Sequence, residues 1–320
     1  MKKFLFNLIL LFAIIVIGYL VISYIVNQNP KHINDYMSAI KDKHKRIQEI
    51  NKPKIILAGG SNLAFGIDSE LIEDRFSVPV VNLGLHAGLG LDFIINELKK
   101  SINERDVVIL SIEYFLGNGD YDLQNYVREL YPDASEFYNR NILKDIQIHI
   151  DDTRKKLKTI NQPVLIDTSF LVYSRKSFNK HGDVIAHLDQ MPPKELADRL
   201  VFKYQYWEGI EALNEFYEFA KVKKVDVFFA FPNYPKSEYE KNQVAIARLQ
   251  NDLLKDLSIE VINTPQDFVF DDSLFYDTVY HLNKKGRELR TEKLIEVIGK
   301  NTNAQKSLYA IRELEGMQAL

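Results

Sequence analysis

The segment Ile55-Ile56-Leu57-Ala58-Gly59-Gly60-Ser61-Asn62 decides the fold of this 320-residue chain. A short apolar run ends in two glycines and a serine, and a helical pattern follows, which is typical of a buried strand, a tight turn and a helix start. Ser61 is therefore expected at the carboxyl edge of a sheet, where open α/β sheets bind ligands. The same residues also fit an ordinary strand-to-helix turn in which Ser61 or Asn62 caps the helix.

Four more apolar runs of strand length follow this segment. They alternate with amphipathic helical patterns, which predicts an α/β domain with a doubly wound, flavodoxin-like sheet of five parallel strands covered by helices on both faces. The expected strands are 54–58, 78–83, 106–112, 226–230 and 258–262, and the expected helices between or after them are 69–75, 91–103, 207–221, 238–257 and 283–298.

A nearly continuous apolar stretch, Phe4–Val26, precedes the domain. At about 1.5 Å per residue it can cross a hydrocarbon core of ~30 Å. It is longer than the core of a cleavable signal, and no small-residue cleavage site follows it. Residues 1–27 are therefore expected to be a retained transmembrane signal anchor, with a cleaved signal as the alternative. The body of the chain is expected outside the cytoplasm, in the periplasm or at the outer face; the reversed topology is the alternative.

The remaining segments are assigned by their patterning. Residues 28–53 are polar but carry apolar residues at helical spacing, so a stalk helix is expected there. Residues 54–299 form the α/β domain. Within it, residues 114–206 interrupt the strand–helix rhythm and are expected to form an insertion, a lid or substrate wall, with a long helix over 134–158. Residues 300–320 are expected to form a C-terminal helix.

Composition excludes several classes of function. With 41 basic and 44 acidic residues the formal net charge is −3, which is not the charge of a nucleic-acid-binding surface. The absence of cysteine excludes disulfides, thiolate catalysis and cysteine-bound metal. The pattern His181-x-Asp183-x-x-x-His187 has residue types that bind zinc or manganese. A loop followed by a helix is the favoured interpretation of this pattern, so no metal or other cofactor is expected.

A second polar block, Phe275–Gly286, lies directly before the last expected helix. It places Asp277 four residues ahead of His281. An aspartate at this spacing can accept a hydrogen bond from Nδ1 of the imidazole, while the other ring nitrogen takes a proton from a serine hydroxyl. A surface loop in which Asn283 caps the helix is the alternative.

Taken together, these blocks resemble the SGNH (GDSL-like) hydrolase superfamily. In that superfamily the nucleophilic serine follows the first strand in a Gly-Asp-Ser-like block, and the sequence here has Gly59-Gly60-Ser61-Asn62. A block after the second strand supplies an oxyanion-hole glycine, and the matching segment is Asn82–Gly88. The last block carries the catalytic Asp and His before the final helix, at the positions of Asp277 and His281.

Three positions depart from the pattern of the superfamily. Gly60 stands where the first block usually has an aspartate. Asp277 precedes His281 by four residues, whereas the spacing is commonly three. The third block usually supplies an oxyanion-hole asparagine after the third strand, but Ser111–Phe115 contains none. Loss of one such donor typically lowers the rate by about 10²–10³.

The resemblance, which covers about residues 54–112 and 224–299, implies a set of site residues. The implied catalytic triad consists of Ser61, His281 and Asp277. The implied oxyanion hole draws on Gly84, Gly88 and Asn62, and the candidate substrate contacts are His86, Glu113 and Tyr114.

The signal anchor and the departures make the chain similar to a membrane-anchored subgroup of this superfamily. Its members work beside membrane-bound O-acyltransferases, as do the alginate O-acetylation proteins and the accessory protein of lipoteichoic-acid D-alanylation. The resemblance implies a serine acylhydrolase or O-acyltransferase that acts on acyl esters of a cell-envelope polysaccharide, glycopolymer or lipid-linked substrate. The implied partner is a membrane-bound O-acyltransferase. The alternative is a catalytically silent scaffold or glycan-binding partner with the same fold.

Overall fold

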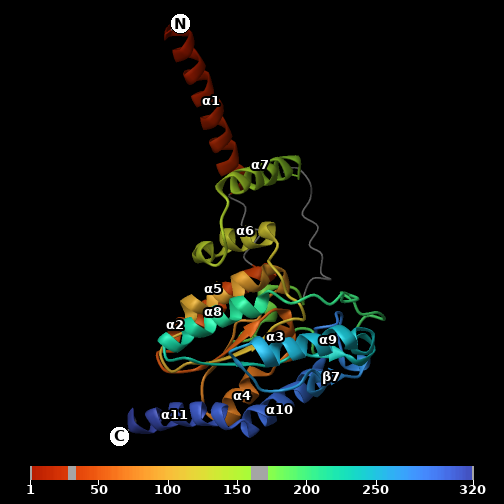
Figure 1. The fold of residues 1–320 in the computed structure, drawn as a ribbon. Helices are drawn as coiled ribbons and strands as arrows, with labels where there is room; N and C mark the ends of the chain where they lie inside the picture. Colours follow the sequence, from red (N-terminus) through yellow and green to blue (C-terminus); the bar gives the residue numbers. More distant parts are fainter. Residues whose placement is uncertain (1, 28–33, 160–171, 319–320) are drawn as a thin grey trace. The chain divides into compact units, whose positions relative to one another are not determined.

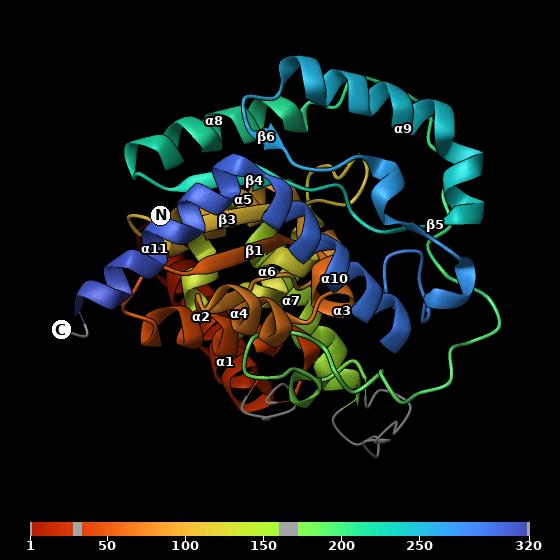
Figure 2. The same ribbon diagram turned by 90° about the horizontal axis from the view of Figure 1, so that it is seen from below.

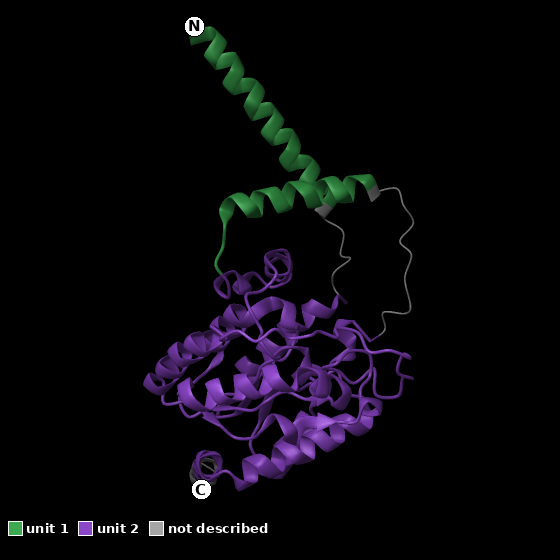
Figure 3. Ribbon diagram, turned by 45° about the vertical axis from the view of Figure 1, so that its right-hand side comes forward, with its two compact units in different colours: residues 1–33, 139–168 green, residues 34–138, 169–320 purple. Residues whose placement is uncertain are grey.

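The computed structural model describes residues 2–27, 34–159 and 172–318, which form two compact units (Figure 3). The smaller unit consists of the described parts of 1–33 and 139–168, and the larger of 34–138 and the described parts of 169–320. The larger unit contains every strand of the sheet and all of the candidate site residues.

The larger unit is built on a parallel sheet of five strands with the order β2-β1-β3-β4-β6, part of which is visible in Figure 2. Each strand overlaps one of the five apolar runs, so the α/β class and the five-stranded parallel sheet are confirmed. The bounds are β1 Ile55–Gly59, β2 Val80–Asn82, β3 Val107–Ser111, β4 Asp226–Phe229 and β6 Glu260–Val261. At the carboxyl edge Gly59 of β1 pairs with Ser111 of β3.

Both faces of the sheet are buried. Alternate side chains of a strand point to opposite faces, so a strand can contribute to the apolar clusters on both sides. Ile56 and Ala58 of β1 belong to one apolar cluster, and Ile55 and Leu57 to the other. The first face is covered by α5 (Gly90–Ser101), α8 (Gly209–Val222) and α9 (Lys236–Asp256). The second is covered by α3 (Ser61–Gly66), α4 (Ser69–Phe76), α10 (Lys284–Lys300) and α11 (Thr302–Gln318) (Figure 1). Helix α11 is the expected C-terminal helix.

The segment expected to be a stalk is instead part of the larger unit. Residues 36–49 form the short η1 (Tyr36–Ala39) and α2 (Ile40–Glu49), and Ile40 is 1 % exposed. The ammonium of Lys43, 2 % exposed, donates hydrogen bonds to the carbonyls of Asn82 (2.8 Å) and Gly182 (2.6 Å). The stalk prediction is therefore wrong for this segment, and residues 28–33 lie outside the described residues.

The expected insertion is divided between the two units. Helix α6 (Tyr121–Leu130) and the short η3 (Pro132–Glu136) belong to the larger unit, and α7 (Ile142–Thr159) belongs to the smaller. The helix expected over 134–158 is α7, which begins at Ile142, eight residues later than expected. The first residues of the expected range instead belong to η3, which begins at Pro132. The remaining short elements are η2 Ala87–Leu89, η5 Arg175–Ser177, β5 Tyr234–Pro235, η6 Pro265–Phe268, β7 Val269–Phe270 and η7 Asp272–Leu274.

The N-terminal helix α1 (Lys2–Asn27) belongs to the smaller unit. By length and composition it is apolar enough to cross a membrane, as a transmembrane anchor or a signal sequence would be. Its apolar side chains are exposed along nearly the whole helix; Phe4 and Phe12, for example, are 72 % and 68 % exposed. A water-soluble helix seldom leaves so much apolar surface uncovered.

Candidate functional site

The turn between β1 and α3 places Ser61 at the carboxyl edge of the sheet, as the first residue of α3. Two glycines make this turn sterically feasible. A Cβ at Gly59 would lie 2.0 Å from the carbonyl oxygen of Ser111, and a Cβ at Gly60 would lie 2.3 Å from the carboxylate of Glu113. Both neighbours come from the adjacent strand β3 or its end, so the glycines allow that strand to approach the turn closely.

The carboxylate of Glu113 holds the turn from both sides of Ser61. It accepts hydrogen bonds from the backbone N–H groups of Gly60 and Asn62, each at 3.1 Å, and it is 4 % exposed. Within the described part of the chain, the backbone N–H of Ser61 has no hydrogen-bond acceptor, as expected for the first turn of a helix. Glu113 thus fills the space that a side chain at Gly60 would occupy.

Arg290 of α10 supports the same turn from the interior. Its guanidinium, 1 % exposed, donates to the carbonyl of Asn62 at 2.5 Å, to the Asn62 side-chain oxygen at 2.8 Å and to the hydroxyl of Ser111 at 3.0 Å. Burial lowers the pKa of Arg290 to about 9, and the charge of Glu113 opposes this shift. The residue is therefore a cation at neutral pH.

His281 and Asp277 form the hydrogen-bonded pair expected from their spacing. The imidazole Nδ1 lies 2.8 Å from Asp277 Oδ1, and His281 is 6 % exposed. The hydroxyl of Tyr173 donates to the other oxygen of Asp277 and lies 3.3 Å from Nδ1. Burial raises the pKa of Asp277, but the hydrogen bonds from His281 and Tyr173 and the charge of His281 outweigh it and bring this pKa below its ordinary value. The aspartate is therefore ionised and oriented toward the imidazole.

The imidazole of His281 packs on Phe65, a residue of the same short helix as Ser61. The rings of Phe65 and His281 are stacked, with centroids 3.9 Å apart and planes inclined by 7°. Phe65 follows Ser61 by four residues on α3, so both side chains lie on the same face of the helix, one turn apart. Within the described residues the Ser61 hydroxyl and His281 share no hydrogen bond. Catalytic hydrogen bonds are often long in the absence of substrate and tighten when it binds.

His187 supports the loop that carries His281. Its Nε2 lies 2.9 Å from the carbonyl oxygen of Leu282, and its ring packs against Phe65 with centroids 4.8 Å apart. Burial lowers the pKa of His187 to about 4, so the ring is neutral at pH 7 and its Nε2–H donates to this carbonyl. His187 therefore positions the loop, and its low pKa makes it a weaker proton acceptor than an ordinary imidazole.

The expected oxyanion donors already have partners inside the protein. The N–H of Gly84 donates to Asn82 Oδ1, and the N–H of Gly88 donates to His86 Nδ1, both at 2.9 Å. The side-chain amide of Asn62, fully buried, donates to the carbonyl of Ser111 at 2.9 Å. The structure therefore places Asn62 in the support of the turn rather than in an oxyanion hole, which corrects the expectation for its side chain.

Gly84 nevertheless lies against the turn between β1 and α3. A Cβ at Gly84 would be 2.8 Å from the carbonyl oxygen of Gly60, so only glycine lets the loop after β2 pack here. Rotation of the Asn82 side chain would release the Gly84 N–H. Among the described residues of the turn, the backbone N–H of Ser61 has no hydrogen-bond acceptor, so it is available as a donor without any side-chain movement.

The three candidate substrate contacts lie in different surroundings. His86 is exposed on the surface, and partial burial of its ring together with the charge of nearby His281 lowers its pKa. Glu113 is buried beneath the turn, as described above. Tyr114 is 6 % exposed and packs edge-on against Tyr234 with ring centroids 5.3 Å apart, so it belongs to the core and not to a substrate surface.

The residues of the His181–His187 pattern do not converge. Asp183 is fully buried and accepts hydrogen bonds from the hydroxyl of Ser69 at 2.6 Å and the side chain of Asn82 at 2.8 Å, and His187 faces Leu282. Among the described residues no group of three or more His, Asp or Glu side chains is arranged to hold a metal ion.

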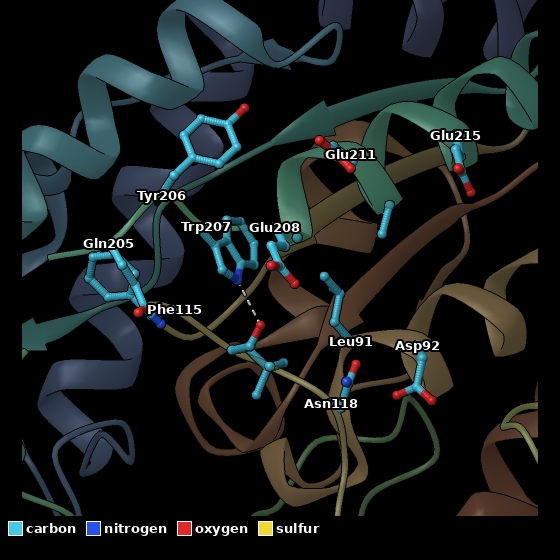
Figure 4. A pocket seen from close by; sticks show the side chains of 14 residues that line it. Leu91, Asp92, Phe115, Asn118, Gln205, Tyr206, Trp207, Glu208, Glu211 and Glu215 are labelled. Atoms are coloured by element: carbon cyan, nitrogen blue, oxygen red, sulfur yellow. Dashed lines mark hydrogen bonds between the residues drawn. The ribbon is translucent and has the colours of Figure 1, made fainter. Parts of the chain in front are cut away.

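A separate cavity of about 700 Å³ opens near the same edge of the sheet (Figure 4). It is bounded by the chain just after Glu113 and by the first turns of α5 and α8. Figure 4 shows aromatic side chains on one side and carboxylates on the other, with Trp207 Nε1 donating to the carbonyl of Leu116 at 2.7 Å. The labelled lining residues are Leu91, Asp92, Phe115, Asn118, Gln205, Tyr206, Trp207, Glu208, Glu211 and Glu215.

No protein-family model matches the chain, and no curated protein is significantly similar to it.

Several supporting residues of the site were not predicted from the sequence. Phe65, Tyr173 and His187 reach it only through tertiary packing, which local pattern does not report. Arg290 did leave a signal. It lies four residues before Leu294 and eight before Ile298, on the apolar stripe of the last expected helix, where a charged residue is rare unless it is paired.

Proposed function

We propose that this chain is a membrane-anchored serine acylhydrolase or O-acyltransferase that acts on acyl esters of a cell-envelope polysaccharide or glycopolymer. The observation that carries the proposal is the His281–Asp277 pair, 2.8 Å apart, with the imidazole stacked on the ring that follows Ser61 by one turn of α3. A buried Asp–His pair next to a serine at the start of a helix is the constellation that activates a hydroxyl nucleophile.

The proposed reaction proceeds through an acyl-enzyme. Ser61 Oγ attacks the ester carbonyl while Nε2 of His281 takes its proton, and Asp277 stabilises the resulting imidazolium through Nδ1. The tetrahedral intermediate places its oxyanion at the N–H of Ser61, with Gly84 as the second donor once Asn82 moves. The carbon–oxygen bond to the leaving alcohol then breaks, and His281 protonates that alcohol. Water or a sugar hydroxyl attacks the acyl-serine and regenerates Ser61.

The fold supports the proposal. The order β2-β1-β3-β4-β6 is that of flavodoxin-like doubly wound sheets, in which ligands bind where the strand order reverses. That point lies between β1 and β3, and Ser61 and Glu113 follow these two strands directly. The position of the site and the order of its blocks are both as in the SGNH superfamily, to which we assign the chain by this analogy.

The cavity near Trp207 supports a glycan as the carrier of the acyl group. Aromatic side chains with nearby carboxylate and amide groups suit a polyhydroxylated ligand, because a sugar ring packs on the aromatic face while its hydroxyls donate to the carboxylates. A membrane-bound O-acyltransferase is the partner that fits an anchored enzyme of this kind.

A second function is a catalytically silent scaffold or glycan-binding partner of such an acyltransferase. It is favoured by Glu113, which presents an acceptor rather than a donor beside Ser61. A carboxylate at this position contributes no hydrogen bond to an oxyanion.

Labelling with a fluorophosphonate probe distinguishes the two functions. The full chain in detergent is expected to react, and the variant Ser61→Ala is expected to lose the label. Ser307→Ala, a serine on α11, is the matched control and should label as the wild type does. An unlabelled wild type with its fold intact, or equal labelling of Ser61→Ala, contradicts the enzyme; glycan binding without labelling supports the scaffold.

A further inference from the structure

Helix α7 of the smaller unit carries an apolar stripe, interrupted by Thr153, and much of this stripe is uncovered. Ile142, Leu143 and Ile146 are 71 %, 79 % and 52 % exposed, and Leu157 near the other end is 42 % exposed. Ile142, Ile146, Ile150 and Leu157 recur at spacings of four, four and seven residues, which keeps them on one side of a helix.

The side of α7 that carries this stripe is the side that contacts α1. Thr153, which lies between Ile150 and Leu157 on the stripe, accepts a hydrogen bond from the hydroxyl of Tyr19 at 3.4 Å. The next turn of α1 makes a second contact, because Ser23 Oγ lies 2.8 Å from Nε2 of His149. The stripe therefore lies on the side of α7 that contacts α1, and most of α1 extends from that side (Figures 1 and 3). Within this unit the two helices cross near the C-terminal end of α1 (Figures 1 and 3).

The position of these contacts along α1 fixes a depth in a membrane. The candidate span ends at Val26, seven residues after Tyr19 and three after Ser23. At about 1.5 Å per residue, the contacts lie about 10 and 5 Å inside the end of the span. Amphipathic helices that lie on a membrane bury their apolar face to about 5–10 Å.

We propose that α7 is an interfacial helix that lies in the headgroup region of the leaflet from which α1 emerges, with its apolar stripe in the acyl chains. Lipid is the occupant that fits, because the stripe continues the lipid-facing surface of α1 at the depth where the bilayer changes from apolar to polar. The last turns of α7 also carry a basic cluster suited to anionic headgroups, namely Arg154, Lys155, Lys156 and Lys158.

The natural absence of cysteine allows a direct test in the full chain. Single cysteines replace Leu143 or Ile146 on the stripe, and Lys144 or Lys155 on the opposite side. Each variant is labelled with an environment-sensitive fluorophore and reconstituted into vesicles of phosphatidylcholine and phosphatidylglycerol. Quenching by nitroxide-labelled lipid is compared with quenching by iodide in the water. Leu20→Cys on α1 and Met191→Cys, 91 % exposed in the larger unit, serve as the lipid and water controls.

The proposal predicts that the ratio of lipid to iodide quenching is several-fold higher at 143 and 146 than at 144 and 155. It is overturned if all four positions are open to iodide while position 20 is quenched by lipid. Protection of 143 and 146 from both quenchers also overturns it, because a protein partner or a second copy then covers the stripe. Iodide quenching at position 20 removes the premise that α1 is inserted and overturns it as well. None of these outcomes depends on the acyl chemistry of Ser61.

Discussion

Replacing Glu113 by Gln tests the most unusual feature of the site, a buried carboxylate that binds two backbone N–H groups on either side of Ser61. A hydrogen bond to a charged acceptor contributes about 1.5–3 kcal/mol, so the two bonds together contribute about 3–6 kcal/mol. The glutamine oxygen retains one bond, while its NH₂ group opposes the other N–H donor. The variant is therefore expected to lose about 2–3 kcal/mol of the free energy of unfolding.

Urea unfolding followed by tryptophan fluorescence measures this loss. Trp207 is the only tryptophan of the chain and lies two residues before α8, so its emission reports on the larger unit alone. With a slope of about 2–3 kcal/mol per molar urea, the midpoint should fall by about 1 M. The exposed Glu208→Gln makes the same chemical change on the surface and should shift stability by less than about 0.5 kcal/mol. Equal midpoints for the two variants would refute the role of Glu113 in holding the turn.

Three further predictions concern the residues around His281 and the segment once expected to be a stalk. Tyr173→Phe removes a hydrogen bond to Asp277 and should slow acylation of Ser61 about tenfold, which corresponds to about 1.4 kcal/mol. Tyr204 is a hydrogen-bonded tyrosine remote from the site, and Tyr204→Phe should leave the acylation rate unchanged. The pKa of His187 is lowered to about 4 in the folded state, so the unfolded chain binds more protons between pH 6.5 and 4. As the pH is lowered from 6.5 to 4, the free energy of unfolding of the wild type should therefore fall by about 3 kcal/mol. His187→Gln should not show this loss. Burial lowers the pKa of Lys43 to about 7, so between pH 7 and 10.5 the unfolded chain binds one proton more than the folded chain. The free energy of unfolding of the wild type, relative to that of Lys43→Met, should therefore rise by up to about 1.4 kcal/mol per pH unit in this range. A difference between the two proteins that does not change with pH would exclude a buried, titrating Lys43.

Local pattern was enough to find the sheet and the Asp–His pair. The apolar runs that form β1 and β3 are short, rich in branched residues and bounded by turn residues. Their length and these flanking residues therefore identified them as strands. Asp277 and His281 are four residues apart in the same loop, and a contact at such short range depends little on the rest of the fold.

Features that depend on tertiary packing could not be predicted from the sequence. The apolar face of residues 36–49 predicted a helix correctly, but periodicity does not say what a face packs against, and the segment proved to be part of the body. The same limit applies to Glu113. Its carboxylate reaches Gly60 across 53 positions of sequence, and only the pairing of β1 with β3 brings the two together.

The most direct test of the central claim is to trap the acyl group on the protein. The full chain is mixed with an activated acetyl ester, quenched in acid after seconds and digested, and the peptide that contains Ser61 is analysed by mass spectrometry. The proposed mechanism predicts one added acetyl group on Ser61 in the wild type, and much less when His281 is replaced by Gln in a chain that still folds. An adduct that is absent from folded wild-type protein, or equally abundant in His281→Gln, would contradict it.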